Sequence, residues 1–158
     1  MNIYLIRHGK AEPTSSLVDD KERQLTDEGK KILRSSAEQW KSVIKQPDFI
    51  LTSPLIRAVQ TAEIIAEVMN FNDGVLNENL LLPGSSTNSL IELSKSLNAE
   101  NIFFVAHQPD LSFHLSRFIG NTEVNLKFSP GSIAKISFEG KPKLGKGVLA
   151  FLLPPVTI

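Results

Sequence analysis

The feature of this sequence that most constrains its fold is a short apolar run, Ile3 to Ile6, that stops abruptly at Arg7, His8 and Gly9. The run is too short for a buried helix and is rich in β-branched and aromatic side chains, so it predicts a strand buried on both faces. Such a strand belongs to a parallel or mostly parallel sheet, because helices cover both faces of these sheets. Ligands of open sheets of this kind bind beyond the carboxyl ends of the strands. The cation, the imidazole and the glycine are therefore predicted to lie where this class of fold binds ligands.

Helical and apolar segments alternate through the next part of the chain. Residues 26–44 carry apolar side chains at spacings of three and four behind a plausible cap at Thr26, and they predict a helix. Residues 49–51 predict a second buried strand. Thr52, Ser53 and Pro54 have the pattern of a helix start, and the helix they introduce is expected to continue to Met69.

The same order repeats after a connecting segment at 70–86 and a short predicted helix at 87–97. Residues 102–106 are a third buried apolar run, which ends at His107, and Pro109 and Asp110 begin a helix that Gly120 closes. Residues 133–138 and 148–153 predict two strands in a hairpin-like sheet edge. We therefore expect a single α/β domain over residues 1–158, a three-layer sandwich with a mostly parallel central sheet and helices on both faces.

Charge and composition narrow the possible functions. Lys plus Arg number 17 and Asp plus Glu also number 17, so no net charge favours nucleic acid or an acidic membrane surface as a partner. The sequence has no Cys, which excludes disulfides and thiolate nucleophiles. No apolar run approaches the roughly 20 residues that a membrane helix needs, and no signal-like segment opens the sequence. We expect a cytoplasmic protein.

Four charged or titratable side chains are predicted to meet at one edge of the sheet. His8, Thr52 and His107 follow three strands that share an edge if the strands are parallel. Arg7 lies beside His8, and Arg57 lies in the first turn of the helix after Thr52, where the helix amides already favour an anion. Two fixed guanidinium groups bind phosphoryl oxygens bidentately and stay charged near neutral pH. The expected ligand of this edge is a phosphate group.

The chemistry left to such a pocket is phosphoryl transfer to an imidazole. One histidine would attack phosphorus and carry the phosphoryl group, while the other stabilises the charge that builds on the equatorial oxygens. His8 is the better nucleophile candidate, because a backbone carbonyl beside it could fix its tautomer. No pair of His, Asp or Glu shows ligand spacing on one helix face and the arginines would repel a cation, so we expect neither a metal nor another cofactor.

Each of these residues also has a purely structural interpretation. A single histidine at a strand end is more often a hydrogen-bonded structural residue than a catalyst, but two histidines with two arginines favour catalysis. Arg57 could instead pair with Glu63 or Asp48 at the surface. His114 lies on an amphipathic helix and is expected to face solvent or to be satisfied within the core.

The motifs together resemble the histidine phosphatase superfamily, which is also called phosphoglycerate mutase-like. The resemblance rests on Arg7-His8-Gly9 after the first strand, on the stretches Arg23 to Gly29 and Thr52 to Ala62, and on His107. Within the superfamily the chain looks most like the small phosphohistidine phosphatases of the SixA type, by its length, its Arg-His-Gly-Lys-Ala opening and its closing stretch from Gly145 to Pro154. The resemblance implies His8 as phospho-acceptor and Arg7, Arg57 and His107 as the rest of the phosphate pocket.

One residue of the family pattern is matched only loosely. Members that act on alkyl phosphates usually supply a carboxylic acid that protonates the leaving oxygen, and the corresponding position here is Glu78, which is more simply an ordinary loop carboxylate. A phosphohistidine substrate needs such an acid less, because a neutral imidazole, whose conjugate acid has a pKa of about 6.5, leaves far more easily than an alkoxide. The expected activity is therefore removal of phosphate from phosphohistidine in a signalling protein. A broad phosphatase for small phosphorylated molecules and a non-catalytic phosphate-binding module are the alternatives.

Overall fold

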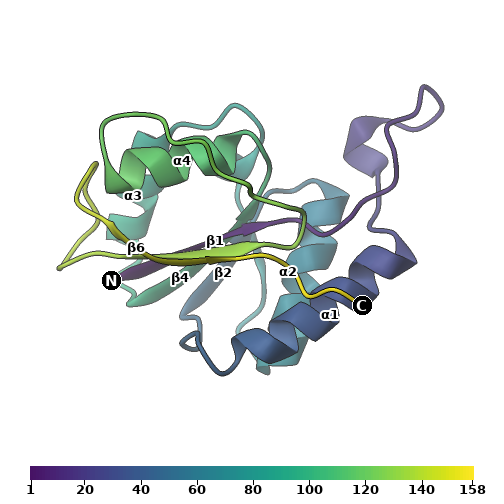
Figure 1. The fold of residues 1–158 in the computed structure, drawn as a ribbon, viewed down its shortest axis with the longest axis horizontal. Helices are drawn as coiled ribbons and strands as arrows, with labels where there is room; N and C mark the ends of the chain where they lie inside the picture. The colour runs from purple at the N-terminus through teal and green to yellow at the C-terminus, as the bar shows by residue number, and fades with distance from the viewer.

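A six-stranded sheet forms the centre of the computed structural model, which describes residues 1–158 (Figure 1). The strand order is β3-β2-β4-β1-β5-β6. Strands β1 to β4 are parallel to one another, β5 is antiparallel to β1, and β6 is antiparallel to β5, which confirms the mostly parallel sheet and its hairpin-like edge. The strands are β1 (Asn2–Arg7), β2 (Phe49–Thr52), β3 (Leu76–Asn77), β4 (Asn101–Ala106), β5 (Ile133–Ser137) and β6 (Val148–Leu153).

Helices cover both faces of this sheet, as predicted. The pair α1 (Asp27–Trp40) and α2 (Ile56–Met69) lies on one face, and the pair α3 (Thr87–Ser96) and α4 (Asp110–Ile119) lies on the other (Figure 1). Two short 3-10 turns, η1 (Asp20–Glu22) and η2 (Asn79–Leu81), lie in the connections. None of the helices is both long enough and apolar enough to cross a membrane.

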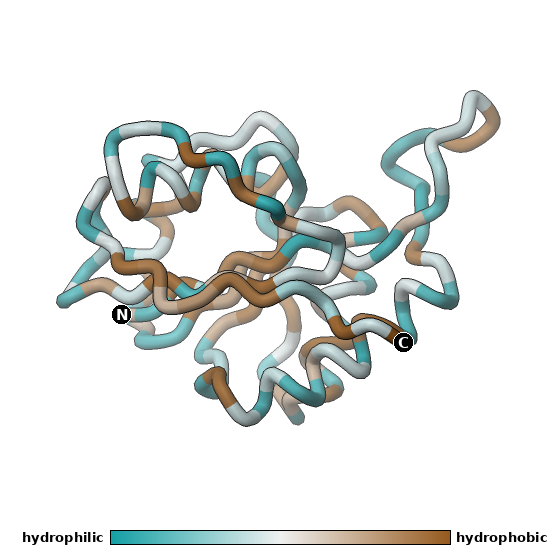
Figure 2. The backbone as a smooth tube through the Cα atoms, in the orientation of Figure 1, coloured by the Kyte–Doolittle hydropathy of each residue, from teal (hydrophilic) through white to brown (hydrophobic).

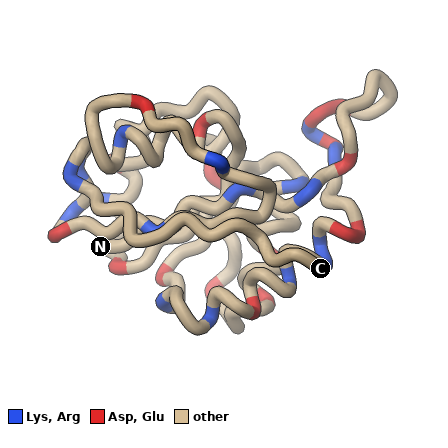
Figure 3. The backbone as a smooth tube through the Cα atoms, viewed as in Figure 1, with Lys and Arg blue, Asp and Glu red and all other residues tan.

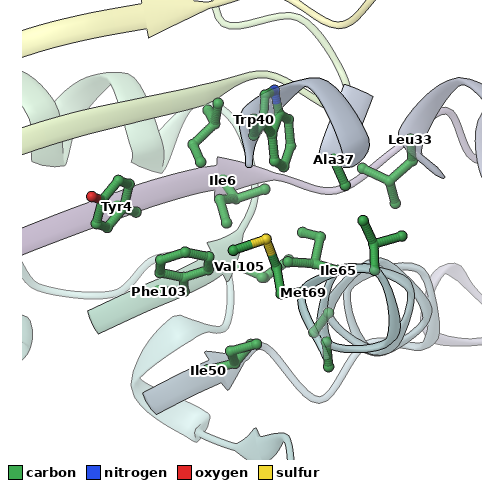
Figure 4. Close-up of a cluster of buried hydrophobic side chains, with 14 of the residues drawn as sticks. Tyr4, Ile6, Leu33, Ala37, Trp40, Ile50, Ile65, Met69, Phe103 and Val105 are labelled. Atoms are coloured by element: carbon green, nitrogen blue, oxygen red, sulfur yellow. The ribbon is translucent and has the colours of Figure 1, made fainter. Parts of the chain in front are cut away.

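The apolar side chains of the sheet divide between two cores. Tyr4 and Ile6 of β1 belong to the core under α1 and α2, which Figure 4 shows together with Phe103 and Val105 of β4. The alternate residues Ile3 and Leu5 belong to the core under α3 and α4. The backbone trace is accordingly most hydrophobic along the central strands (Figure 2). Burial of each large side chain contributes about 1.5–3 kcal/mol, and this packing on two faces fixes the edge where the strands end.

Two helix boundaries differ from the sequence prediction. Thr26 does cap α1, its hydroxyl accepting a hydrogen bond from the Gly29 amide at 2.9 Å, but α1 ends at Trp40 and not near residue 44. The Ser42 hydroxyl donates to a carbonyl of the last helical turn there, and Val43 is exposed. The helix start predicted at Thr52-Ser53-Pro54 is wrong: α2 begins at Ile56, because Thr52 still belongs to β2 and Ser53 has another partner.

The carboxyl ends of β1, β2 and β4 meet at one edge of the sheet. Arg7 is in register with Ala106, and Thr52 is in register with Val105. The residues that follow these strands therefore lie side by side, as the parallel arrangement predicted. Acidic and basic residues are interspersed along the backbone (Figure 3).

Candidate active site

His8 and His107 lie against each other at this edge of the sheet. Their ring centroids are 5.2 Å apart and the rings are inclined by 53°. Both side chains are almost buried, with 8% and 3% of their surface exposed. The sheet thus brings together two imidazoles that lie 99 residues apart in the sequence.

The backbone fixes the orientation of the His8 ring. Its Nδ1–H donates to the carbonyl oxygen of Gly9 at 2.7 Å, which leaves the lone pair on Nε2. Burial, and then the positive charges of Arg57, Arg7 and Arg23, lower the pKa of His8 to about 4 against the hydrogen bond to Gly9. His8 is therefore a neutral imidazole at pH 7, with Nε2 able to act as a nucleophile.

Ser53 holds the His107 ring. The Ser53 hydroxyl lies 2.8 Å from Nε2 of His107 and also accepts a hydrogen bond from the Leu55 amide at 3.3 Å. Burial, and then the charges of His8 and Arg57, lower the pKa of His107 to about 3. In the tautomer in which the hydroxyl donates to Nε2, the proton of the neutral ring lies on Nδ1. That Nδ1 atom is buried and has no hydrogen-bond partner, so it can donate to a phosphoryl oxygen.

Arg7 reaches the site from the end of β1. Its Nη1 donates to the carbonyl oxygen of Phe128 at 2.8 Å, and its Nε is buried without a partner. Burial lowers the pKa of Arg7, but a guanidinium stays charged at neutral pH.

Arg57 is buried in the first turn of α2 and pairs with an acidic residue that sequence reasoning did not identify. Its Nη1 donates to the backbone carbonyl of Asp20 at 2.8 Å, and its Nη2 donates to the Asp20 carboxylate at 3.1 Å. The alternative of a surface pair with Glu63 or Asp48 is wrong, because the Asp48 carboxylate binds backbone amides of residues 100 and 101 and Glu63 makes no ion pair. The Nε of Arg57 remains buried without a partner.

Unpartnered buried polar atoms are concentrated in these residues. Only four buried side-chain N or O atoms in the structure lack a partner: Arg7 Nε, Arg57 Nε, His107 Nδ1 and Ser132 Oγ. Buried polar atoms are normally hydrogen-bonded, so such a concentration points to a function. Three of the four are nitrogens of the residues predicted to bind phosphate. A ligand with several acceptor oxygens could accept a hydrogen bond from each of these nitrogens. No group of three or more His, Cys, Asp or Glu side chains is arranged to hold a metal ion.

Several residues that support the site were not predicted. Ser53 appears in the sequence as an ordinary helix cap before a proline, and nothing local marks it as a partner of His107. Thr61 accepts a hydrogen bond from the Gly9 amide at 3.0 Å and donates to the Arg57 carbonyl at 2.7 Å, so it ties β1 to α2. Ser132 contributes the carbonyl that binds the Arg7 amide. Only the position of Thr61, four residues after Arg57 on the same helix face, offered a signal.

Glu78 directly follows β3, and its amide donates to the carbonyl of Thr52, the last residue of β2, at 2.8 Å. Its carboxylate accepts a hydrogen bond from the Leu80 amide at 3.0 Å and so caps η2. A role for Glu78 as proton donor stays a prediction.

The third histidine, His114, lies outside the site. It is buried under α3 and α4, with Nδ1 2.7 Å from the Thr87 hydroxyl and Nε2 3.0 Å from the Ser85 hydroxyl. Of the two interpretations given above, satisfaction within the core is confirmed and exposure to solvent is wrong.

Comparison with known proteins identifies the relatives of this chain. The family model of the histidine phosphatase superfamily, branch 1, matches residues 3–80. An uncharacterized protein of Picosynechococcus sp. is 34% identical over 113 residues, which cover 70% of this chain and 68% of the relative. The phosphohistidine phosphatase SixA homolog of Haemophilus influenzae is 27% identical over 150 residues, 89% of this chain and 90% of the relative. A solved protein histidine phosphatase SixA complexed with tungstate has the same fold, with a TM-score of 0.80, 22% identity, and coverage of 97% of this chain and 96% of that one.

Proposed function

The chain belongs to the histidine phosphatase superfamily, and from this premise we propose that it removes phosphate from phosphohistidine in a signalling protein by way of a phosphohistidine intermediate on His8. As a member of this superfamily, the chain is a phosphatase. The observation that supports the proposed site is the cluster of His8, His107, Arg7 and Arg57, in which three buried nitrogens have no protein partner.

The two steps of the reaction follow from this arrangement. In the first step the Nε2 lone pair of His8 attacks phosphorus, the bond between phosphorus and the leaving imidazole of the substrate breaks, and that imidazole gains a proton. The Nε groups of Arg7 and Arg57 and the Nδ1–H of His107 are the donors available to the equatorial oxygens. The proton on the leaving imidazole comes from solvent, because His8 keeps its Nδ1–H on the Gly9 carbonyl. In the second step water attacks phosphorus and gives up a proton to solvent, the bond to His8 breaks, and inorganic phosphate leaves with His8 neutral again.

Phosphohistidine is favoured over an alkyl phosphate by the weakness of the proton-donor position. The Glu78 carboxylate caps η2, and a leaving imidazole needs an acid much less than a leaving alkoxide does. The chain between Arg57 and His107 forms α2, β3, η2, α3 and β4 and contributes no separate lid domain, which suits a side chain presented by another protein. The name of the Haemophilus relative supports the same substrate class.

The experiment that tests this proposal compares phosphate release from three substrates: a phosphohistidine-bearing protein, a phosphoserine peptide and an aryl phosphate. We expect the first to react fastest, no turnover in His8→Ala, and an acid-labile phosphoryl group on His8 of the wild type by mass spectrometry. Glu78→Gln is expected to leave phosphohistidine hydrolysis unchanged.

The alternatives give different results. Equal or faster hydrolysis of the esters, with loss of that activity in Glu78→Gln, would support the broad phosphomonoesterase. Binding of inorganic phosphate by calorimetry without release from any substrate would support the non-catalytic module. Release that survives His8→Ala would remove His8 from the mechanism.

A further inference from the structure

Arg57 is held at one end by a single residue of a projecting segment. Residues 12–25, here called the strap, leave the body of the molecule after β1 and return before α1 (Figure 1). Asp20 of the strap binds both Nη atoms of Arg57, one through its backbone carbonyl at 2.8 Å and one through its carboxylate at 3.1 Å. The Arg57 side chain is 6% exposed and that of Asp20 is 53% exposed, so the buried partner depends on the exposed one.

These contacts leave part of the guanidinium free. Arginine has five N–H donors, of which Asp20 takes one on each Nη atom. The Nε of Arg57 is buried and has no partner. Asp20 and a phosphoryl oxygen can therefore bind Arg57 together, on different edges of its plane.

The same carboxylate is tied to a second arginine. The other oxygen of Asp20 accepts from Nη1 of Arg23 at 2.8 Å, and Arg23 is anchored in turn to the Glu12 carbonyl at 2.9 Å and the Thr14 hydroxyl at 3.2 Å. Acidic and basic residues accordingly lie close together along the strap (Figure 3). Asp20 is thus a fixed bridge between two guanidinium groups, and its own negative charge raises the pKa of His107 against the effects of burial and the arginines.

We propose that Asp20 is a positioning residue for phosphate binding: it holds the Nη end of Arg57 so that the Nε edge of the guanidinium is presented to the phosphoryl group. The inference rests on the proposed function, since it assigns Arg57 to the phosphate. An isolated exposed ion pair would stabilise the fold little and would have no effect on an anion bound at Arg57. A blocking role, in which the carboxylate competes with phosphate for Arg57, predicts the opposite change in affinity.

The test measures binding of inorganic phosphate by calorimetry, and KM and kcat for phosphate release, in wild type, Asp20→Ala and Asp20→Asn. Asp19→Ala is the matched control, because Asp19 lies in the same strap and caps η1 but does not touch an arginine of the site. Asp20→Ala removes the carboxylate contacts with Arg57 and Arg23 and keeps the backbone carbonyl. We expect it to weaken phosphate binding and raise KM about tenfold or more with a smaller change in kcat. The phosphate affinity of Asp20→Asn should lie between those of the wild type and Asp20→Ala, because one amide oxygen cannot accept from both arginines. Asp19→Ala should bind phosphate like the wild type.

The outcomes separate the possibilities. Tighter phosphate binding in Asp20→Ala would overturn the positioning role in favour of blocking. Unchanged binding in both Asp20 variants, or an equal loss in Asp19→Ala, would reduce the contact to a structural ion pair. A wild type that releases no phosphate from any substrate but binds inorganic phosphate in an Asp20-dependent way would contradict the proposed function and leave the positioning role intact. A wild type that neither binds inorganic phosphate nor releases it from any substrate would overturn both.

Discussion

Two buried imidazole sites of this molecule look alike by burial and differ in their partners. His8 and His107 at the sheet edge and His114 between α3 and α4 are all buried, and burial is the main cause that lowers the pKa values of all three, to about 4, 3 and 4. Both ring nitrogens of His114 have hydroxyl partners, whereas Nδ1 of His107 has none. The pKa values of the sheet-edge pair are lowered further by arginines, whereas the charge of Asp110 acts in the opposite direction on His114.

The difference shows which observations point to chemistry. A buried histidine with a depressed pKa is as typical of a satisfied core residue as of a catalyst, so neither property identifies a site. Cations beside a neutral imidazole, together with buried donors that lack partners, are unfavourable for the fold unless a ligand uses them. We therefore expect His114 to contribute to stability and the sheet-edge pair to contribute to ligand binding.

The largest expected effect separates the two sites by activity. His8→Ala should lower kcat for phosphohistidine hydrolysis by at least about a thousandfold, because the proposed mechanism passes the phosphoryl group through His8. His114→Ala should leave kcat within about twofold at temperatures well below its unfolding transition. The measurement is phosphate release at saturating substrate. A large loss of kcat in the folded His114 variant would mean that the second imidazole site is also catalytic, and the comparison would fail.

The next effect concerns the cations that only the sheet-edge site possesses. Arg57→Ala should lower kcat/KM by about a hundredfold, the usual cost of removing one donor to transition-state charge. Arg57→Lys should recover little of it, because an ammonium cannot bind Asp20 and an oxyanion on separate edges. Arg34→Ala is the matched control, since Arg34 forms an exposed ion pair with Glu67 on the same pair of helices. If the two alanine variants had equal kcat/KM values, Arg57 would not belong to the phosphate pocket.

The sequence predicts the residues of the sheet-edge site better than it predicts their support. His8 and His107 could be placed because each follows a buried strand. Arg57 could be placed because it lies in the first turn of the helix that follows β2. Asp20 could not, because its segment has no periodicity and its position depends on contacts with Arg57, 37 residues away. Ser53 has the pattern of a helix cap, and only the tertiary structure shows that its hydroxyl lies against His107. The fold itself was predictable because strands, helices and their alternation are local patterns.

A smaller effect should appear in stability and not in activity. His114→Ala should lower the free energy of unfolding by about 2 kcal/mol, because it leaves the Thr87 and Ser85 hydroxyls without their partner. Denaturant unfolding at pH 7.5 measures this change. Ser94→Ala offers a control on α3, because its buried hydroxyl donates only to a carbonyl of its own helix. A loss no larger than that of Ser94→Ala would show that the hydroxyl partners of His114 contribute little.

The smallest effect is the pH dependence of that stability difference. The folded pKa of His114, about 4, lies below the unfolded value of 6.5, so the unfolded chain takes up the proton first as pH falls. The stability that the neutral imidazole provides is therefore fully present above pH 6.5 and is lost as pH falls toward 4. Between pH 6.5 and 5.5 the gap between wild type and His114→Ala should narrow by about 1 kcal/mol. His8 and His107 are present in both proteins and cancel in the comparison, so a gap that stays constant or widens would show that burial does not hold His114 neutral.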